Sequence, residues 1–340
     1  MTSNRRVKLV DIGKLIVESE DIPVPGENEY LVKISSVGVC GSDVHYFEHG
    51  RIGNFVVESP LVLGHEASGV IVEAGPGADQ DRVGNRVAIE PGVPCGRCMQ
   101  CRMGRYNLCP SVRFLATPPI DGAFSDYIVH NGDFLYDIPD GMSDDQAALC
   151  EPLSVGIWAN RRAHVSPGDR ILVTGCGPIG LMVAQVSRAR GARVILSDII
   201  PSRLNAARTL GFDELHDAAS APIEESGITA DVLMECTGVA DVAFRSISVL
   251  APAGRAVLVG MSPEKDQALP VATIQVREIV LTGVFRYANT YPVAIELFER
   301  GMIQIDPLVG AKYGLDDVAA ALRASREDPA CIKPMVVPSL

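Results

Sequence analysis

The sequence predicts an α/β protein in which a β-rich first part is joined to a doubly wound parallel sheet. Two observations carry this prediction. Residues 1 to about 150 contain short β-branched runs such as YLVKISSVGV, separated by turns such as PGEN, which is typical of an irregular and mostly antiparallel β region. From about Pro167, short apolar strands such as RILVTG alternate with longer amphipathic stretches, and this alternation indicates β-α-β units.

The pattern becomes mixed again after about residue 285. Helical periodicity is present in YPVAIELFERG (291–301) and LDDVAAALRAS (315–325), and IKPMVV (332–337) is typical of a strand. With 340 residues, the chain is long enough for about two domains. We therefore expect two helices and a final strand in the C-terminal segment.

Composition excludes several classes of function. Asp and Glu number 42 against 30 Lys and Arg, and the net charge of −12 argues against nucleic acid as the main ligand. Apolar residues make up 47%, which argues against disorder. Because no apolar run reaches the ~18 residues of a membrane span and the first residues lack the apolar core of a secretory signal, we expect a soluble, cytoplasmic protein.

A glycine-rich turn follows the predicted strand at 170–174. Gly175, Gly177 and Gly180 form G-x-G-x-x-G, in which glycines permit a tight turn, close approach to a pyrophosphate and close helix–strand packing. The next strand ends at Asp198, where a carboxylate can accept hydrogen bonds from both ribose hydroxyls. Together these features predict a dinucleotide site; the alternative is a glycine-rich turn with a helix-capping aspartate.

Four of the nine cysteines fall within fifteen residues. Cys95, Cys98, Cys101 and Cys109 could supply four thiolates to a tetrahedral zinc ion with no open position. Such a closed site has no room for substrate, so we expect a structural zinc that folds a loop with little core of its own. An iron–sulfur cluster is the competing interpretation of the same spacing.

Three separate segments carry further side chains that can bind a metal. They are Cys40–His45 (CGSDVH), Gly64–Glu66 and Cys150–Pro152. Taken singly, the three segments are better explained by a buried core thiol, a turn histidine and a helix-starting glutamate. Spacing alone does not show that the three segments converge.

The order of these motifs resembles the zinc-dependent medium-chain dehydrogenase family over essentially the whole chain. Three stretches resemble its polyol branch, the sorbitol and xylitol dehydrogenases: CGSDVHYFEHGRIGNFVVESPLVLGHEASG, EPLSVGIWA and GVFRYANTYPVA. The resemblance implies a GroES-like β-rich catalytic domain, at 1–150 and 286–340, with a Rossmann-type NAD-binding domain at 151–285 inserted into it.

The same resemblance implies a catalytic zinc ion. Cys40, His65 and Glu66 would be its ligands, with Glu151 beside the metal, directly or through its water. The spacing to Ser154 and Gly156 aligns Glu151 with the family's third ligand, so Cys150 is interpreted as a packing neighbour. Because all four cysteines of the 95–109 loop are present, two zinc ions per subunit are expected.

By resemblance, Ser42 and His45 form a proton relay from the reacting alcohol; the alternative is a turn cap and a surface histidine. The polyol hydroxyls would be bound by Tyr46, Glu151, Arg286 and Tyr287, because a polar pocket rejects analogues that lack a matching hydroxyl. A surface salt bridge is the alternative for Arg286.

The resemblance also implies a set of cofactor-binding residues. They are Gly175, Gly177, Ile179, Gly180, Asp198, Arg203, Val259, Val284, Phe285 and Arg286. Asp198 favours NAD over NADP, because a 2′-phosphate would lie close to its carboxylate. An arginine five residues beyond Asp198 could instead pair with an acid on its own helix.

The predicted function is a zinc-dependent oxidoreductase that transfers a hydride from a secondary alcohol of a polyol to NAD+, giving the ketose. Alternatives are a zinc dehydrogenase of another secondary alcohol or diol, a zinc-independent quinone or enone reductase on the same fold, and a non-catalytic nucleotide-binding or structural protein. The expected partners are a small polyol and further copies of the chain, since the family suggests a homotetramer, with neither nucleic acid nor membrane.

Overall fold

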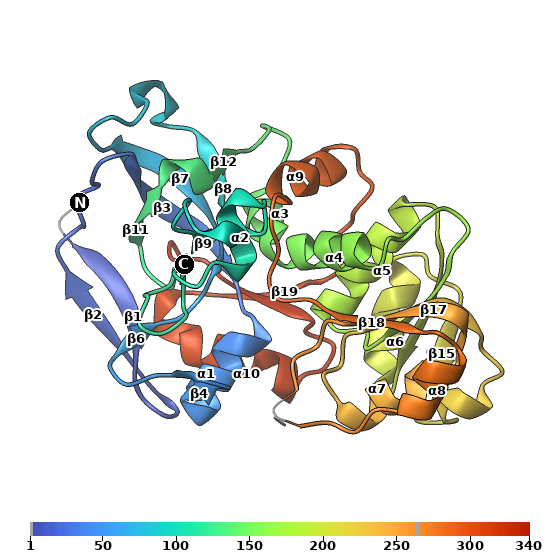
Figure 1. Ribbon diagram of the computed structural model, residues 1–340. Helices are drawn as coiled ribbons and strands as arrows, with labels where there is room; N and C mark the ends of the chain where they lie inside the picture. The colour runs from blue at the N-terminus through green and yellow to red at the C-terminus, as the bar shows by residue number, and fades with distance from the viewer. Residues whose placement is uncertain (1–2, 263–265) are drawn as a thin grey trace. The chain divides into compact units, whose positions relative to one another are not determined.

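A computed structural model describes residues 3–262 and 266–340 of the chain (Figure 1). The chain divides into two compact units. The first comprises Met1–Glu151, Tyr291–Glu299 and Val309–Leu340, and the second comprises Pro152–Thr290 and Arg300–Leu308. The assignment of zinc chemistry to 1–150 with 286–340, and of NAD binding to 151–285, stays a prediction.

The first unit is built around a seven-stranded mixed sheet with the strand order β12-β8-β7-β3-β20-β19, in which β11 also pairs with β3. Val32, Val37 and Ile71 in the central strands β3 and β7 are fully buried, as expected for β-branched residues on a packed sheet face. The C-terminal strand β20 lies antiparallel to β3, which confirms the strand predicted at the end of the chain. The strands are β3 (Glu29–Gly38), β7 (Glu66–Ala74), β8 (Arg86–Ile89), β11 (Tyr127–Asn131), β12 (Leu135–Asp137), β19 (Val309–Tyr313) and β20 (Lys333–Val336).

Smaller elements complete this unit. A three-stranded sheet contains β1 (Asn4–Asp11), β2 (Lys14–Glu20) and β6 (Leu61–Val62), and two short antiparallel pairs are β4 (Arg51–Ile52) with β5 (Phe55–Val56) and β9 (Gly92–Val93) with β10 (Arg113–Phe114). The helices are α1 (Gly41–His49), α2 (Met99–Arg102), α3 (Asp144–Ala148), α9 (Tyr291–Glu299) and α10 (Val318–Glu327). Helices α9 and α10 occur where helical periodicity predicted them, and α10 contacts α1 (Figure 1).

The second unit contains a six-stranded sheet in which every neighbouring pair is parallel. Its order, β15-β14-β13-β16-β17-β18, is that of a doubly wound dinucleotide-binding fold, which confirms the predicted fold class. The strands are β13 (Arg170–Thr174), β14 (Arg193–Asp198), β15 (Leu215–Asp217), β16 (Ala230–Glu235), β17 (Leu250–Leu258) and β18 (Val280–Gly283), and the helices are α4 (Cys150–Arg162, which begins in the first unit), α5 (Pro178–Ala189), α6 (Pro201–Thr209), α7 (Ala240–Ile247) and α8 (Val271–Val276).

Local sequence explains how this sheet is built. Ile171, Leu172 and Val173 are consecutive in β13 and all fully buried, because a parallel sheet is covered on both faces. Helix α5 starts with Pro178 at its first position, where the fixed φ suits the helix and the missing N–H is not needed. In the part of the chain that the structure describes, no helix is both long and apolar enough to cross a membrane.

Candidate metal centres and dinucleotide site

The cysteine lobe, defined as residues 95–109, brings its four sulfur atoms together. The Sγ atoms of Cys95, Cys98, Cys101 and Cys109 all lie within 4.8 Å of one another. Backbone amides point at two of them: the N–H of Cys101 donates to Cys98 Sγ at 3.5 Å, and that of Cys95 donates to Cys109 Sγ at 3.4 Å. N–H groups that point at sulfur stabilise thiolates, and a set of four sulfur donors fits a closed zinc site.

The environment of the lobe suits metal binding. Backbone hydrogen bonds from Arg97 and Cys98 lower the pKa of the Cys95 thiol to about 6, whereas burial and the neighbouring thiols raise the pKa of Cys101 to about 12. Cys95 is therefore readily deprotonated, and a bound metal would favour the thiolate of Cys101. The lobe has little core of its own, since the side chains of Met99 and Met103 are 69% and 55% exposed. A loop without a core needs another source of folding energy, and a bound metal supplies it.

A second group of metal-capable side chains forms from distant segments. One ligand atom each from Cys40, His65 and Glu66 lies within 4.8 Å of the other two. Cys40 precedes α1, and Glu66 is the first residue of β7, directly after His65. Strand pairing explains their proximity, because β7 lies beside β3 with Glu66 opposite Gly38, two residues before Cys40. The thiol, imidazole and carboxylate form a donor set that fits zinc and leaves a fourth position open.

Asp43 holds the segments of this group together through hydrogen bonds and lies beside His65. Its buried carboxylate accepts hydrogen bonds from the backbone N–H of Cys40 at 3.0 Å and of Gly64 at 2.9 Å. It also lies 3.5 Å from Nδ1 of His65. Although burial lowers it, Asp43 and Cys40 together raise the pKa of His65 well above its ordinary value. A carboxylate behind a histidine orients the ring toward a metal.

Glu66 has a second partner on the C-terminal strand. Both of its carboxylate oxygens accept hydrogen bonds from Nζ of Lys333, at 2.8 and 2.7 Å, and both side chains are almost completely buried. Gly38 makes room for this carboxylate, because a Cβ there would clash with Glu66 Oε2. The negative charge of the candidate ligand is therefore compensated inside the protein.

Glu151 is buried beside this cluster but is not part of the converging group that residues 3–262 and 266–340 form. It interacts electrostatically with Lys333 and with Glu90. Its place near the metal therefore stays a prediction. Cys150, the preceding residue, is completely buried, and burial raises the pKa of its thiol.

Glu90 is a buried carboxyl group that connects the lobe to the core. It accepts hydrogen bonds from the hydroxyls of Tyr106, within the lobe, at 2.7 Å and of Tyr136 at 2.9 Å. Burial raises the pKa of Glu90 to about 7, against the effect of the two hydroxyls, and the charge of Glu151 contributes in the same direction. The lobe is thus anchored on a buried acid that interacts electrostatically with Glu151.

Helix α1 carries the three other residues predicted around the reacting alcohol. Ser42 is half-buried, His45 is exposed and Tyr46 is buried. Arg286 and Tyr287 belong to the second unit, where the Arg286 guanidinium lies 4.9 Å from the Phe285 ring centroid. The roles of these residues stay predictions.

The predicted dinucleotide residues gather at the carboxyl ends of the parallel strands. Gly175 has a φ of +91° directly after β13, and a Cβ at Gly180 would clash with the carbonyl oxygen of Gly175. Only glycine fits both positions. Asp198 is the last residue of β14, Val259 follows β17, and Val284, Phe285 and Arg286 follow β18. Arg203 lies in the first turn of α6, and Gly177 and Ile179 lie at the start of α5. Ligands of doubly wound sheets bind at this edge.

Asp198 is fixed by two backbone amides. Its Oδ2 accepts from the N–H of Cys176 in the glycine turn at 2.6 Å, and its Oδ1 accepts from the N–H of Ile200 at 2.8 Å. Arg203 lies close enough to act electrostatically on Cys176. The carboxylate is therefore held in place, whereas the arginine belongs to a half-exposed helix position.

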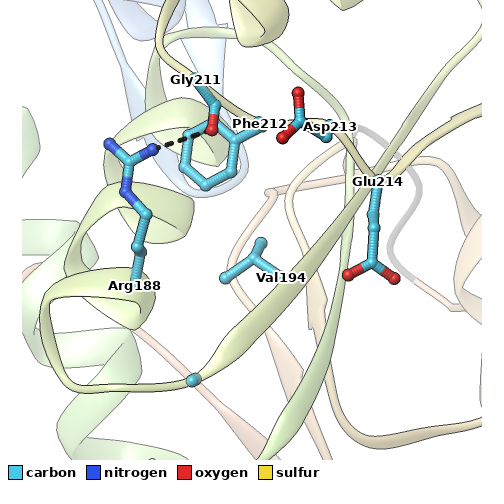
Figure 2. Close-up of a pocket in the computed structure, with 7 residues that line it drawn as sticks. Arg188, Val194, Gly211, Phe212, Asp213 and Glu214 are labelled. Carbon is cyan, nitrogen blue, oxygen red and sulfur yellow. Dashed lines mark hydrogen bonds between the residues drawn. The ribbon is translucent and has the colours of Figure 1, made fainter.

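A shallow pocket on the second unit lies away from this edge (Figure 2). Arg188, Val194 and Phe212 line it, near the amino end of β14, and the Arg188 guanidinium stacks 4.3 Å from the Phe212 ring centroid. Because Arg188 already donates to the carbonyl oxygens of Leu210 and Gly211, the pocket is part of the local packing of this loop.

Sequence reasoning missed Asp43, Lys333, Glu90 and Glu235 as site residues. Asp43 stands within the CGSD motif, so its spacing to Cys40 could have suggested it. Glu235 ends β16 and binds the turn that follows, accepting from the backbone N–H of Thr237 at 2.7 Å. For Lys333 and Glu90 no local signal exists, since their partners are distant in the chain.

Comparison with known proteins identifies the class. Residues 26–140 match the model of the alcohol dehydrogenase GroES-like domain, and residues 178–300 match that of the zinc-binding dehydrogenases. The chain belongs to the zinc-binding dehydrogenase family. This confirms the predicted family, the GroES-like and Rossmann-type fold class, and the class of enzyme.

Particular relatives narrow the comparison. The chain is 43% identical over 333 residues to the sorbitol dehydrogenase of Bacillus subtilis, covering 95% of this chain and 94% of that protein. It is 42% identical to human sorbitol dehydrogenase, over 93% of this chain and 90% of that one. Its fold matches an Escherichia coli alcohol dehydrogenase crystallised with NADH, with a TM-score of 0.93, 29% identity and coverage of 99% and 100% of the two chains.

Proposed function

We propose that this chain is an NAD-dependent polyol dehydrogenase that oxidises a secondary alcohol to the ketose. The observation that carries the proposal is the group of Cys40, His65 and Glu66, in which His65 and Glu66 are buried and Cys40 is half-buried. These mixed donors fit a metal that keeps a position open for substrate. A zinc-independent reductase on the same fold has no use for such a group. The sorbitol dehydrogenases of Bacillus subtilis and human give the substrate class.

Zinc and NAD+ would carry out different parts of the reaction. When bound, zinc would lower the pKa of the substrate hydroxyl as a Lewis acid, and NAD+ would accept the hydride. The remaining tasks belong to side chains of the protein. Asp43 orients His65, and Lys333 balances the charge of Glu66. A second zinc ion, held by the cysteine lobe, has a structural role.

Proton removal and substrate binding are assigned to the predicted residues. Ser42 would take up the alcohol proton while it gives up its own hydroxyl proton to the relay, whose last group, His45, would release a proton to water. The half-buried position of Ser42 and the exposed position of His45 agree with these roles. Tyr46, Glu151, Arg286 and Tyr287 bind the other hydroxyls of the polyol. This division explains why a polyol, and not a simple alcohol, would be preferred.

NAD is proposed over NADP because of Asp198. Two unit charges ~4 Å apart at an effective dielectric of ~20 repel by about 4 kcal/mol, and salt reduces this value. About 2.8 kcal/mol is still a hundredfold preference. The two backbone amides that hold Asp198 prevent its carboxylate from turning away from a 2′-phosphate.

A homotetramer in the cytoplasm is the proposed form of the enzyme. Two apolar patches support it, because a tetramer with two-fold symmetry needs two different self-complementary surfaces. One is on the lobe, at Met99, Met103 and Leu108, and the other is at Val276 and Val280 near the edge strand β18. Nine cysteines without a disulfide suit a reducing compartment, and the net charge of −12 disfavours nucleic acid and anionic membrane surfaces.

The test is a panel of polyols, among them sorbitol, xylitol, galactitol, arabinitol and iditol, each assayed with NAD+ and NADP+ and ranked by kcat/KM. A preference for one or more polyols with NAD+ over simple secondary alcohols supports the proposal. Activity confined to a small diol or a non-polyol secondary alcohol would show that polyols are not the substrate class. Quinone reduction without metal would overturn it.

A further inference from the structure

The ammonium nitrogen of Lys333 lies within hydrogen-bond distance of three oxygen atoms. It donates to the carboxylate of Glu66, whose two oxygens are 2.8 and 2.7 Å away, and to the carbonyl oxygen of Val39 at 3.0 Å. Lys333 therefore joins the residue before Cys40 to the residue after His65, and its charge lies within the frame of the metal centre.

The sheet makes this link rigid. Glu66 starts β7, Lys333 starts β20, and β3 lies between these two strands. The backbone N–H of Val39 donates to the carbonyl oxygen of Pro334 at 3.0 Å, so the chain near Cys40 is also tied to β20. Because Gly38 lies directly under the carboxylate, Glu66 can reach over β3 to Lys333. The pairing is thus built by strand register and not by a flexible surface contact.

The position of Lys333 sets up a competition for Glu66. A carboxylate oxygen that accepts a hydrogen bond from an ammonium is a poorer donor to a metal ion, and an ammonium beside a dication repels it. Cys40 and Glu151 add two more negative groups that interact with Lys333. Without the lysine, the buried charge of Glu66 would lose the ion pair that compensates it and would turn to the metal.

We propose that Lys333 is a positioning residue that weakens Glu66 as a ligand, so that a metal held by Cys40, His65 and Glu66 is bound less tightly and readily exchanges the ligand in its open fourth position. This inference rests on the proposed function, since it requires a metal at that group. It assigns to a lysine 267 residues from Glu66 the control of how strongly the metal is held.

The experiment uses the full-length enzyme with cobalt in place of zinc. Visible absorption of cobalt reports its coordination, and transfer to a chelator in excess gives the rate of metal release. Cobalt in the cysteine lobe, with four sulfur ligands, absorbs separately and serves as an internal reference. The variants are Lys333→Met, Lys333→Arg, and Lys312→Met, which removes an exposed ion pair with Asp145 from the neighbouring strand β19.

We expect Lys333→Met to slow cobalt release from the Cys40 site by about tenfold or more, to change the cobalt spectrum because Glu66 binds the metal more strongly, and to lower kcat more than it changes KM. Lys333→Arg should restore most of each value, and Lys312→Met should resemble the parent. Should Lys333→Met fold poorly, the double variant Glu66→Gln/Lys333→Met removes both buried charges, and there the slow release should disappear.

Two outcomes overturn the inference. In the first, Lys333→Met releases cobalt at the parental rate with an unchanged spectrum; in the second, the slow release persists in the double variant, which has no carboxylate to close on the metal. Failure of the proposed function gives a different result. If the proposed function is wrong, the parent protein binds cobalt in the cysteine lobe but not at the Cys40 site.

Discussion

The two metal centres of the first unit are assembled in opposite ways. The cysteine lobe takes four like donors from one stretch of fifteen residues, and three of the four are half-exposed. The cluster of Cys40, His65 and Glu66 takes three different donors from two separate segments, with His65 and Glu66 buried, and Asp43 and Lys333 contact these two ligands. A closed set of like donors stabilises a loop, whereas a mixed and supported set with an open position can carry chemistry.

The largest effect is expected when the mixed cluster is broken. Cys40→Ser removes the thiolate ligand, and kcat/KM should fall by about 10³-fold or more, because a Lewis acid is worth several kcal/mol of transition-state stabilisation. Circular dichroism and NADH binding should change little, since Cys40 lies outside the hydrophobic core of either unit. Full activity of a zinc-free Cys40→Ser protein would exclude a catalytic metal.

Breaking the lobe should affect stability instead. Cys98→Ser leaves three thiolates, and we expect the unfolding free energy to fall by roughly 3–4 kcal/mol or the subunits to assemble less completely, because a structural site contributes folding energy. Turnover per correctly folded molecule should change much less. Thermal denaturation and size-exclusion chromatography, with Cys331→Ser as the matched cysteine control, check this. A variant with parental stability but no turnover would reverse the two roles.

A third test concerns Glu90, the buried acid that binds the cysteine lobe through Tyr106. Its pKa is about 7 in the folded protein against an ordinary value of 4.5, so folding favours the protonated carboxyl. The resulting contribution to stability is complete below pH 4.5 and is lost as the pH rises through 7, by up to about 3 kcal/mol.

Glu90→Gln removes this dependence, because an amide does not ionise. Chemical denaturation at pH 5 and pH 8 should therefore show a smaller loss of stability in Glu90→Gln than in the parent protein. Asp137→Asn, a carboxyl at the surface, is the control. Equal losses in the parent protein and Glu90→Gln would mean that Glu90 is ionised throughout.

The smallest effect is expected at Asp198 in the second unit. Like the cysteines of the lobe, Asp198 belongs to a short sequence motif. Asp198→Ala removes the charge that faces a 2′-phosphate, and the preference for NAD over NADP should narrow by about tenfold, or ~1.4 kcal/mol. The ratio of kcat/KM for the two coenzymes measures it. Asp213→Ala, at the pocket of Figure 2 and away from the carboxyl ends of the strands, should leave this ratio unchanged. An unaltered ratio in Asp198→Ala would remove this residue from coenzyme selection.

Local patterns account for what could be predicted. The spacing of the four cysteines, the glycines after β13 and the acid at the end of β14 each act within a short segment, so the sequence alone indicates them. The β-α-β alternation likewise predicted the parallel sheet. In each case the residues that matter are neighbours in the chain.

Partners chosen by strand register could not be predicted. Glu66 meets Lys333 only because β7 and β20 flank β3, and Glu90 meets Tyr136 only because β12 pairs with β8. His65 and Asp43 come together because α1 follows β3 directly while β7 lies beside it. These contacts depend on which strands pair, and no spacing in the sequence encodes that choice.

Zinc content per chain tests the central claim, two metal sites with separate roles, most directly. Elemental analysis of the purified protein should give about two zinc ions per chain, with about one remaining in Cys40→Ser, which retains stability, and about one in Cys98→Ser, which retains turnover in its folded fraction. One zinc ion or none in the parent protein, or an undiminished content in Cys40→Ser, would contradict the account.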